Sequence, residues 1–285
     1  MEGSMKKKEG IRTIIYGVLA VLIFMLLFFA TYRDRVVKGD EQTPRIVVLG
    51  DSILGECRDE TSIPAQLSKL LGEPVFNGAL GGTCLSRQDK EKRLAYGKDS
   101  FSMAALAKSI IAQDFGVQQA LRIKEPATEY FPAVIDEMEK LDFDEVEVLF
   151  IGHCLNDYHS ATVISDETAP YNEYTFVGAF RSIIEGLRRQ YPEMRIILVT
   201  PTYTWYTAQG LTCEEYDVGG GYLEKYVEAE LALAAELDVE IIDLYHDFYS
   251  HKEWEDWQKY TNDGVHPNST GRTMIAGKLA EYLQK

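Results

Sequence analysis

The chain has 285 residues, of which 46% are hydrophobic and 26% are charged, as is ordinary for a globular protein. The formal net charge is −16, and the region from residue 39 onward carries 22 basic and 42 acidic residues, a net charge of −20. Such a region repels phosphate backbones, so we expect no nucleic-acid partner. About 240 residues remain beyond an N-terminal apolar segment, enough for one large domain with a substantial core.

The N-terminal region predicts a membrane anchor. Residues 1–12 form a short basic tail, and residues 13–32 are 20 consecutive uncharged residues. As a helix they span about 30 Å, the thickness of a bilayer's hydrocarbon core. A cleavable signal peptide is the alternative, but its apolar region is usually shorter and no clear cleavage site follows. We expect a single-pass anchor in the cell membrane, a polar linker over residues 33–43 and a body outside the cell, because a short basic leader usually stays inside.

Residues 44–285 alternate predicted strands with predicted helices. Short apolar runs predict strands at residues 45–49, 74–76, 146–151, 195–200 and 239–244. Apolar residues at helical spacing predict helices at residues 61–71, 101–115, 131–141, 174–190, 222–236 and from 268–270 to 283. Strands separated by helices indicate right-handed βαβ units. We therefore predict one α/β domain, a three-layer α/β/α sandwich around a central parallel sheet of about five strands.

The four cysteines, Cys57, Cys84, Cys154 and Cys213, are spread along the body. No two are close enough in sequence for a C-x-x-C zinc or redox motif. A Cys57–Cys84 disulfide is an alternative in an oxidising compartment, although we favour free, buried thiols. The chain also lacks an H-E-x-x-H motif and a clustered His/Asp set, so we expect no metal site and no cofactor.

Four polar clusters lie where an open parallel sheet places its chemistry. Three directly follow predicted strands, at residues 50–52, 77–83 and 156–157, and the fourth, residues 263–266, precedes the last predicted helix. Taken alone, Gly50-Asp51-Ser52 is more typical of a turn, since all three residue types favour turns. The carboxyl ends of parallel strands share one edge of the sheet, however, so clusters distant in sequence can converge there.

A serine becomes a nucleophile only with a base beside it, and the base needs an orienting partner. Asp263 and His266 can supply the orienting acid and the base from one loop. An acyl-transfer transition state also needs hydrogen-bond donors for the developing oxyanion, and glycine N–H groups and the Asn156 amide are suitable donors.

In order and spacing, these clusters resemble the motifs of the SGNH/GDSL hydrolases across residues 45–275. The shared features are Gly50-Asp51-Ser52-Ile53, a glycine after the second strand, an asparagine in the third block and Asp-x-x-His-Pro near the C-terminus. The resemblance implies a flavodoxin-like sheet with Ser52 as nucleophile, His266 as base and Asp263 as its orienting acid. It also implies an oxyanion hole formed by the Ser52 N–H, the Gly82 N–H and the Asn156 side chain.

At two positions the sequence fits the family motifs less closely. In the second block Gly81 is the fallback for Gly82. In the third block Gly152 is separated from Asn156 by three residues, whereas the usual family pattern is G-x-N-D. Asp157 is expected to anchor the loop and not to take part in chemistry.

Aromatic residues and histidines near these blocks are candidate substrate contacts. Tyr203, Trp205 and Tyr206 either line an acyl or sugar pocket or cover the sheet edge, and the sequence favours neither. His153 lies beside the third block and is a further candidate. The other histidines lack the Asp-x-x-His-Pro context and are expected in loops or on the surface; they are His159, His246 and His251.

The resemblance implies a serine esterase that hydrolyses short acyl esters, such as O-acetyl groups on extracellular carbohydrate. The same acyl-enzyme could pass its acyl group to a sugar hydroxyl, so an O-acyltransferase of surface glycans stays open, as does a lipase or thioesterase for longer chains. A non-enzymatic carbohydrate-binding module would not need Ser52, Asp263 and His266 together. The sequence does not indicate an oligomeric state.

Overall fold

A computed structural model describes residues 43–55, 57–88, 99–121 and 128–285. The predicted basic tail, membrane anchor and linker therefore lie outside the described residues, apart from Thr43. In the part of the chain that is described, no helix is both long enough and apolar enough to cross a bilayer. Residues 44–285 form a single unit and are described below.

Five parallel strands form the central sheet, which confirms the predicted α/β class. They are β1 (Ile46–Gly50), β2 (Val75–Asn77), β3 (Val148–Gly152), β4 (Arg195–Val199) and β7 (Glu240–Ile242). Their spatial order is β2-β1-β3-β4-β7. Every residue of β1 and β3 is buried, because these strands are central and covered on both faces, and this is why they read as continuous apolar runs.

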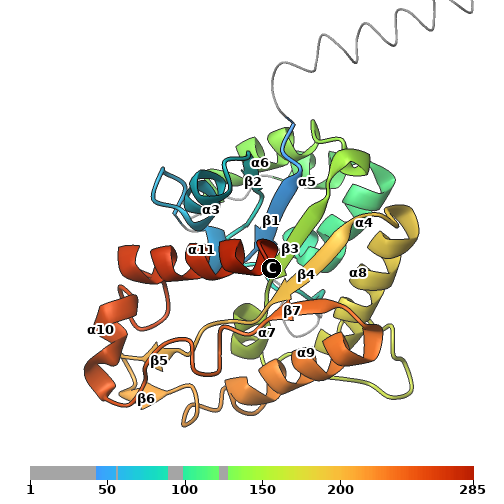
Figure 1. Cartoon of the computed structure of the whole chain (residues 1–285). Coiled ribbons are helices and arrows are strands. Elements are labelled where there is room, and N and C mark those ends of the chain that lie inside the picture. The colour runs from blue at the N-terminus through green and yellow to red at the C-terminus, as the bar shows by residue number, and fades with distance from the viewer. Residues whose placement is uncertain (1–42, 56, 89–98, 122–127) are drawn as a thin grey trace, which may run out of the picture. The chain divides into compact units, whose positions relative to one another are not determined.

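Helices cover both faces of this sheet and complete the three layers (Figure 1). On one face α3 (Ile63–Leu71) packs against α11 (Ser269–Leu283). On the other face α8 (Phe176–Gln190) packs between α4 (Met103–Ala112) and α9 (Leu223–Leu237). The shorter helices are α2 (Ser52–Gly55), α5 (Gly116–Ala120), α6 (Phe131–Met138), α7 (Leu155–His159) and α10 (Trp257–Tyr260).

Helix ends follow local capping chemistry. The Ser62 side chain accepts the Ala65 N–H at the start of α3, and Gly72 ends that helix with a φ of 75°. The helix predicted over residues 101–115 is shorter than expected, because Ser102 caps its start and Gln113 leaves the helix with a φ of 52°. The chain then turns into α5.

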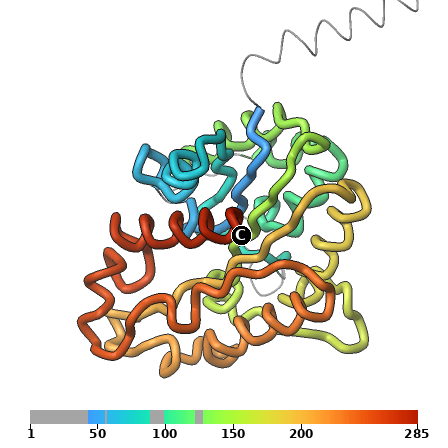
Figure 2. Tube along the Cα trace, viewed as in Figure 1, coloured from blue at the N-terminus to red at the C-terminus, as the bar shows by residue number. Residues whose placement is uncertain are grey.

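A two-stranded hairpin follows β4, in a segment where the sequence predicts neither a helix nor a strand. It consists of β5 (Trp205–Tyr206) and β6 (Leu211–Thr212), paired antiparallel. The Trp205 N–H donates to the Gly264 carbonyl oxygen at 2.8 Å, so the hairpin lies beside the loop before α11, as Figure 2 shows. Strands of two residues are too short for a detectable alternation of apolar and polar residues.

Candidate active site

Ser52, Asp263 and His266 meet at the carboxyl edge of the sheet. Ser52 is the first residue of α2, two residues beyond the end of β1. His266 Nε2 lies 3.1 Å from Ser52 Oγ, and His266 Nδ1 lies 2.7 Å from Asp263 Oδ2. This chain of carboxylate, imidazole and hydroxyl has the geometry that base activation of a serine requires.

The loop that carries Asp263 and His266 is held by its own hydrogen bonds. Asp263 Oδ1 accepts the backbone N–H groups of Val265, at 2.9 Å, and of His266, at 2.8 Å. Gly264 has a φ of 99°, and a Cβ there would lie 2.1 Å from the Trp205 carbonyl oxygen. Only glycine fits this position, so the loop can approach the β5 strand closely.

The charge state of Asp263 suits an orienting acid. Partial burial raises its pKa, but hydrogen bonds from the His266 ring and from the His266 and Val265 N–H groups outweigh burial, and the pKa lies below its ordinary value. The carboxylate is therefore ionised at neutral pH and can stabilise an imidazolium. The side chains of Asp263 and His266 are 52% and 30% exposed, so water reaches the pair.

Gly82 and Asn156 line the same cavity as Ser52. Gly82 has a φ of 71°, a conformation that favours glycine. The neighbouring Gly81 N–H donates to Tyr130 Oη at 2.7 Å, so this donor already has an acceptor within the protein. Gly82 stays the oxyanion donor that the family pattern implies for the second block, and it lines the cavity beside Ser52.

Two side chains that the sequence did not single out hold the second block. The Arg58 guanidinium donates to Asn77 Oδ1, to the Asn77 carbonyl and to the Ala79 carbonyl, at 2.9, 2.7 and 2.9 Å. The same guanidinium lies 4.9 Å from the centre of the Tyr130 ring, whose hydroxyl accepts the Gly81 N–H. The hydrogen-bonded partners are 19 to 49 residues apart in sequence, and Arg58 and Tyr130 are 72 apart, so no local pattern could reveal them.

Asp51 precedes Ser52 in the chain and is only 2% exposed. Its carboxylate accepts the Ile53 N–H at 2.9 Å, and the Asn156 amide nitrogen lies 3.4 Å from its other oxygen. Burial raises the pKa of Asp51 to about 7, although the Ile53 hydrogen bond and the positive charge of His266 lower it. Asp51 thus supports the turn around Ser52 and the amide of Asn156.

A cavity of about 980 Å³ opens beside Ser52. Trp205, Tyr206 and Tyr216 give it an aromatic wall, and His159 and Gln209 add polar groups. His159 Nε2 lies 2.9 Å from Tyr206 Oη. His159 is exposed, as expected, but it also lines the cavity, which the sequence did not indicate. An aromatic wall with polar groups between its rings suits a hydroxylated ligand.

Two of the four candidate contacts do not reach this cavity. Trp205 and Tyr206 line it, whereas Tyr203 and His153 do not, which corrects the expectation for both. Tyr203 is 2% exposed, and its ring stacks on His251 with centroids 4.1 Å apart. His153 is also 2% exposed, and burial lowers its pKa to about 3. Both side chains are buried and lie outside this cavity.

The cysteines and potential metal ligands do not add to the site. The four cysteines are free thiols, three of them buried and Cys57 half-buried, so the alternative Cys57–Cys84 disulfide does not form. Across residues 43–55, 57–88, 99–121 and 128–285, no group of three or more His, Cys, Asp or Glu side chains is placed to hold a metal ion.

Comparison with known proteins places this arrangement in a family. A model of the GDSL-like Lipase/Acylhydrolase family matches residues 48–273. A solved structure from Lactobacillus plantarum is similar, with a TM-score of 0.60 and 17% identity over 85% of this chain and 97% of that chain. A possible lipase from Chitinophaga pinensis DSM 2588 has a TM-score of 0.53 and 18% identity over 84% and 96% of the two chains. No curated protein sequence matches the chain significantly.

An acyltransferase also shares the fold. The salicylyl-acyltransferase SsfX3 from a tetracycline biosynthetic pathway has a TM-score of 0.51 and 12% identity, over 86% of this chain and 55% of that chain. At such identities the structural likeness shows the fold alone. The family model spans most of the described unit, including all four polar clusters, and it identifies the protein as an ester-hydrolysing enzyme. The chain belongs to the GDSL-like lipase/acylhydrolase family.

Proposed function

We propose that this enzyme is a serine esterase that removes short acyl groups, O-acetyl groups in particular, from extracellular carbohydrate. The observation that carries the proposal is the contact chain from Asp263 through His266 to Ser52, with atoms 2.7 and 3.1 Å apart, beside a cavity of about 980 Å³. The exposure of the dyad favours hydrolysis, because water can reach the acyl-enzyme.

In the proposed mechanism, Asp263 holds the proton of His266 on Nδ1, which leaves Nε2 to accept the Ser52 proton. Ser52 Oγ then attacks the ester carbonyl carbon. The oxyanion accepts hydrogen bonds from the Ser52 N–H, the Gly82 N–H and the Asn156 amide. His266 returns the proton to the departing alkoxide, and a water molecule deprotonated by His266 then releases the acid and restores Ser52.

The proposed substrate class has three supports. The family resemblance implies short acyl esters, and the aromatic and polar cavity wall suits a sugar better than a long alkyl chain. The net charge of −20 beyond residue 38 favours neutral polymers over anionic ones.

A panel of p-nitrophenyl esters from acetate to palmitate tests both the chemistry and the acyl length. We expect acetate to be the best substrate and Ser52→Ala to reduce kcat by about 10⁶-fold. A fluorophosphonate probe should label the wild type and not Ser52→Ala. If Ser52→Ala kept most of the activity, the nucleophile would be a different residue, and a preference for palmitate would replace the carbohydrate esterase with a lipase or thioesterase.

Hydrolysis and transfer are separated by adding an acceptor. We expect an acetylated oligosaccharide to release free acetate at the same rate with and without an unacetylated glycan. Acetylation of the added glycan, at the expense of free acetate, would identify an O-acyltransferase.

We also propose that residues 13–32 anchor the enzyme in the cell membrane, with the catalytic body outside. The uncharged stretch of 20 residues and the basic residues before it support this topology. The protein should stay with membranes during alkaline carbonate extraction, and protease added to intact cells should digest the body. Release by carbonate, or protection from protease, would contradict the topology.

A further inference from the structure

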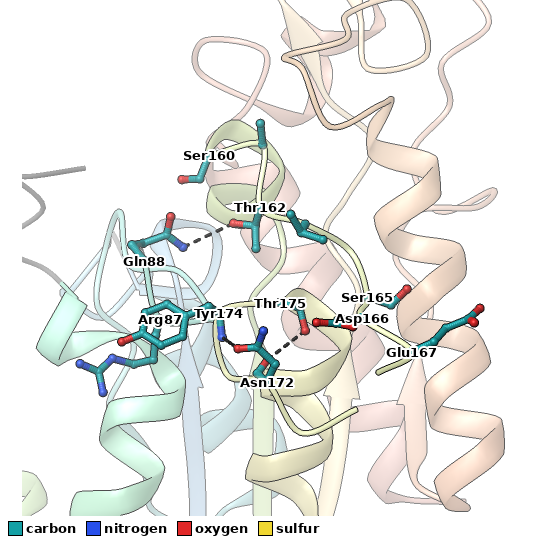
Figure 3. Close-up of a pocket in the computed structure, with 12 residues that line it drawn as sticks. Arg87, Gln88, Ser160, Thr162, Ser165, Asp166, Glu167, Asn172, Tyr174 and Thr175 are labelled. Atoms are coloured by element: carbon teal, nitrogen blue, oxygen red, sulfur yellow. Dashed lines mark hydrogen bonds between the residues drawn. The ribbon is translucent and has the colours of Figure 1, made fainter. Parts of the chain in front are cut away.

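A second cavity, of about 460 Å³, begins where α7 ends (Figure 3). Its walls come from residues 87–88, 160–167 and 172–175. Asn156, which lines the catalytic cavity, is one helical turn before Ser160, which lines the second cavity. One turn rises about 5–6 Å, so the two cavities lie on either side of a short helix end.

Gln88 gives the second cavity a buried polar group without a complete set of partners. The residue is 6% exposed, and its Nε2 donates to Ser86 Oγ at 3.2 Å and to Thr162 Oγ1 at 3.4 Å. Its Oε1 accepts no hydrogen bond from the described residues and is accessible from the cavity, and Figure 3 shows this oxygen on the side of Ser160. A ligand hydroxyl that enters the cavity can donate to this oxygen.

The other walls indicate what kind of ligand fits. The Tyr174 ring is 47% exposed at the rim and offers an apolar face. Asp166 and Glu167 add negative charge, while the Arg87 guanidinium is paired with Asp99 at 2.6 Å. These groups disfavour an anion. An aromatic face, carboxylates and an amide oxygen together suit a neutral, hydroxyl-rich sugar unit.

A hydrogen-bond network joins this cavity to the catalytic cavity. Ser86, which accepts from Gln88, donates its hydroxyl and its N–H to Asp157 Oδ1. The Leu85 N–H donates to Asp157 Oδ2 at 2.6 Å. Asp157 follows Asn156 in α7, so the floor of the second cavity and a proposed oxyanion donor share one support.

We propose that the second cavity is a carbohydrate subsite that binds a neutral sugar unit of the polymer whose ester is cleaved at Ser52. This inference rests on the proposed function for the link to cleavage, although sugar binding itself needs no turnover. The subsite acts on substrate affinity: it holds a sugar at a distance from the ester and leaves the acyl-transfer step unchanged.

Two matched valines test the subsite. Val163 lines the cavity with 54% exposure, and Val117 lies on α5, outside both cavities, with 63% exposure. Val163→Arg places a long side chain across the cavity, beside Asp166 and Glu167, whereas Val117→Arg makes the same change elsewhere. Because both side chains are exposed, neither change disturbs the core.

Binding is measured by calorimetry with the full-length Ser52→Ala protein and with xylo-oligosaccharides and cello-oligosaccharides from disaccharide to hexasaccharide. We expect affinity in at least one series to rise once the oligomer spans both cavities. Val163→Arg should abolish that rise and so weaken the binding of the long oligomers about tenfold, which corresponds to one or two net hydrogen bonds. Val117→Arg should retain the rise. With Ser52 intact, Val163→Arg should raise KM for acetylated oligomers without changing kcat or the turnover of p-nitrophenyl acetate.

Three outcomes would overturn the subsite. Affinity could be independent of oligomer length in both series, or its dependence on length could be unchanged in Val163→Arg. Oligogalacturonates could also bind more tightly than the neutral oligomers. The two proposals fail separately. If binding affinity does not depend on oligomer length but Ser52 is still required for acetyl ester hydrolysis, the subsite alone is rejected. Length-dependent binding without such hydrolysis rejects the proposed function alone.

Discussion

Two Asp-x-x-His segments occupy loops of this domain and have nearly the same internal geometry. In Asp243–His246, as in Asp263–His266, the imidazole Nδ1 lies 2.7 Å from a carboxylate oxygen, and the histidine N–H donates to the other oxygen. Ser52 Oγ lies 3.1 Å from His266 Nε2, whereas His246 makes no hydrogen bond to a serine of the described residues. Spacing alone therefore produces a stable loop, and the neighbouring hydroxyl is what makes one histidine a candidate base.

Replacing the aspartate of each pair with asparagine tests this distinction. Asp263→Asn removes the charge that orients and stabilises His266, and we expect kcat to fall by about 10²–10⁴-fold, less than for a fully buried acid because the carboxylate is half exposed. Asp243→Asn makes the same change in the second pair and should leave kcat unchanged. Steady-state kinetics on p-nitrophenyl acetate decide the matter, and equal losses in both variants would mean that the effect is structural.

The buried carboxyl group of Asp51 should make the stability of the protein depend on pH. Burial raises its pKa from 3.8 to about 7, so the folded protein holds this proton more tightly than the unfolded chain does. The contribution of Asp51 to stability is therefore largest at low pH and falls as the pH rises from about 4 to about 7. Asp51→Asn does not titrate, so the wild type should lose unfolding free energy relative to this variant across that window.

Urea unfolding of both proteins across that range measures the difference directly. His153 and His159 titrate in both proteins, so their contributions cancel in the comparison. A constant difference between the two curves would show that Asp51 has an ordinary pKa.

Among the elements, the second block depends on side chains from elsewhere in the chain. Tyr130, just before α6, accepts the Gly81 N–H next to the proposed oxyanion donor Gly82. In Tyr130→Phe that N–H loses its acceptor, and we expect kcat to fall about tenfold with little change in KM, a smaller loss than the 10²–10³-fold cost of deleting an oxyanion donor.

Tyr191→Phe is the matched control for this experiment. It removes a buried tyrosine hydrogen bond of 2.8 Å to the Ile110 carbonyl, far from Ser52 in sequence and outside the catalytic cavity. Thermal unfolding should show similar destabilisation in the two variants. A similar fall of kcat in both would assign the effect to stability and not to the second block.

The same elements show why some structure was predictable from sequence and some was not. β1 and β3 are buried on both faces, and burial imposes the continuous apolar runs that revealed them. The hairpin of β5 and β6 has two residues in each strand, which leaves no period to detect. Arg58 and Tyr130 act through long-range contacts, and Tyr203 and His153 follow loop geometry that short-range patterns do not encode.

For the whole molecule, the topology explains why the candidate site could be assembled from sequence. Parallel strands bring the ends of β1, β2 and β3 to one edge of the sheet, so three clusters distant in sequence converge without any knowledge of the side chains. The second cavity was not predictable, because residues 87–88 meet residues 160–175 only through contacts distant in sequence, such as the Gln88–Thr162 hydrogen bond, which no local pattern encodes.

The overall negative charge should make the KM for anionic substrates depend on salt. The net charge of −16 repels anionic polymers, and added salt screens that repulsion. We expect KM for acetylated oligogalacturonates to fall as salt is raised from about 10 mM to about 150 mM, while KM for acetylated neutral oligomers stays constant. The same salt response for both classes of substrate would show that net charge does not select between them.

The backbone hydrogen bond between Trp205 and Gly264 constrains how this enzyme can evolve. It ties the aromatic wall of the substrate cavity to the loop that carries His266, so the two cannot shift independently. We expect a substitution that moves this wall to admit a bulkier ester also to shift the His266 imidazole relative to Ser52, and so to slow the proposed reaction. New specificity is therefore more accessible at Ala208 and Gln209, which line the same cavity in the hairpin turn, beyond the shared bond.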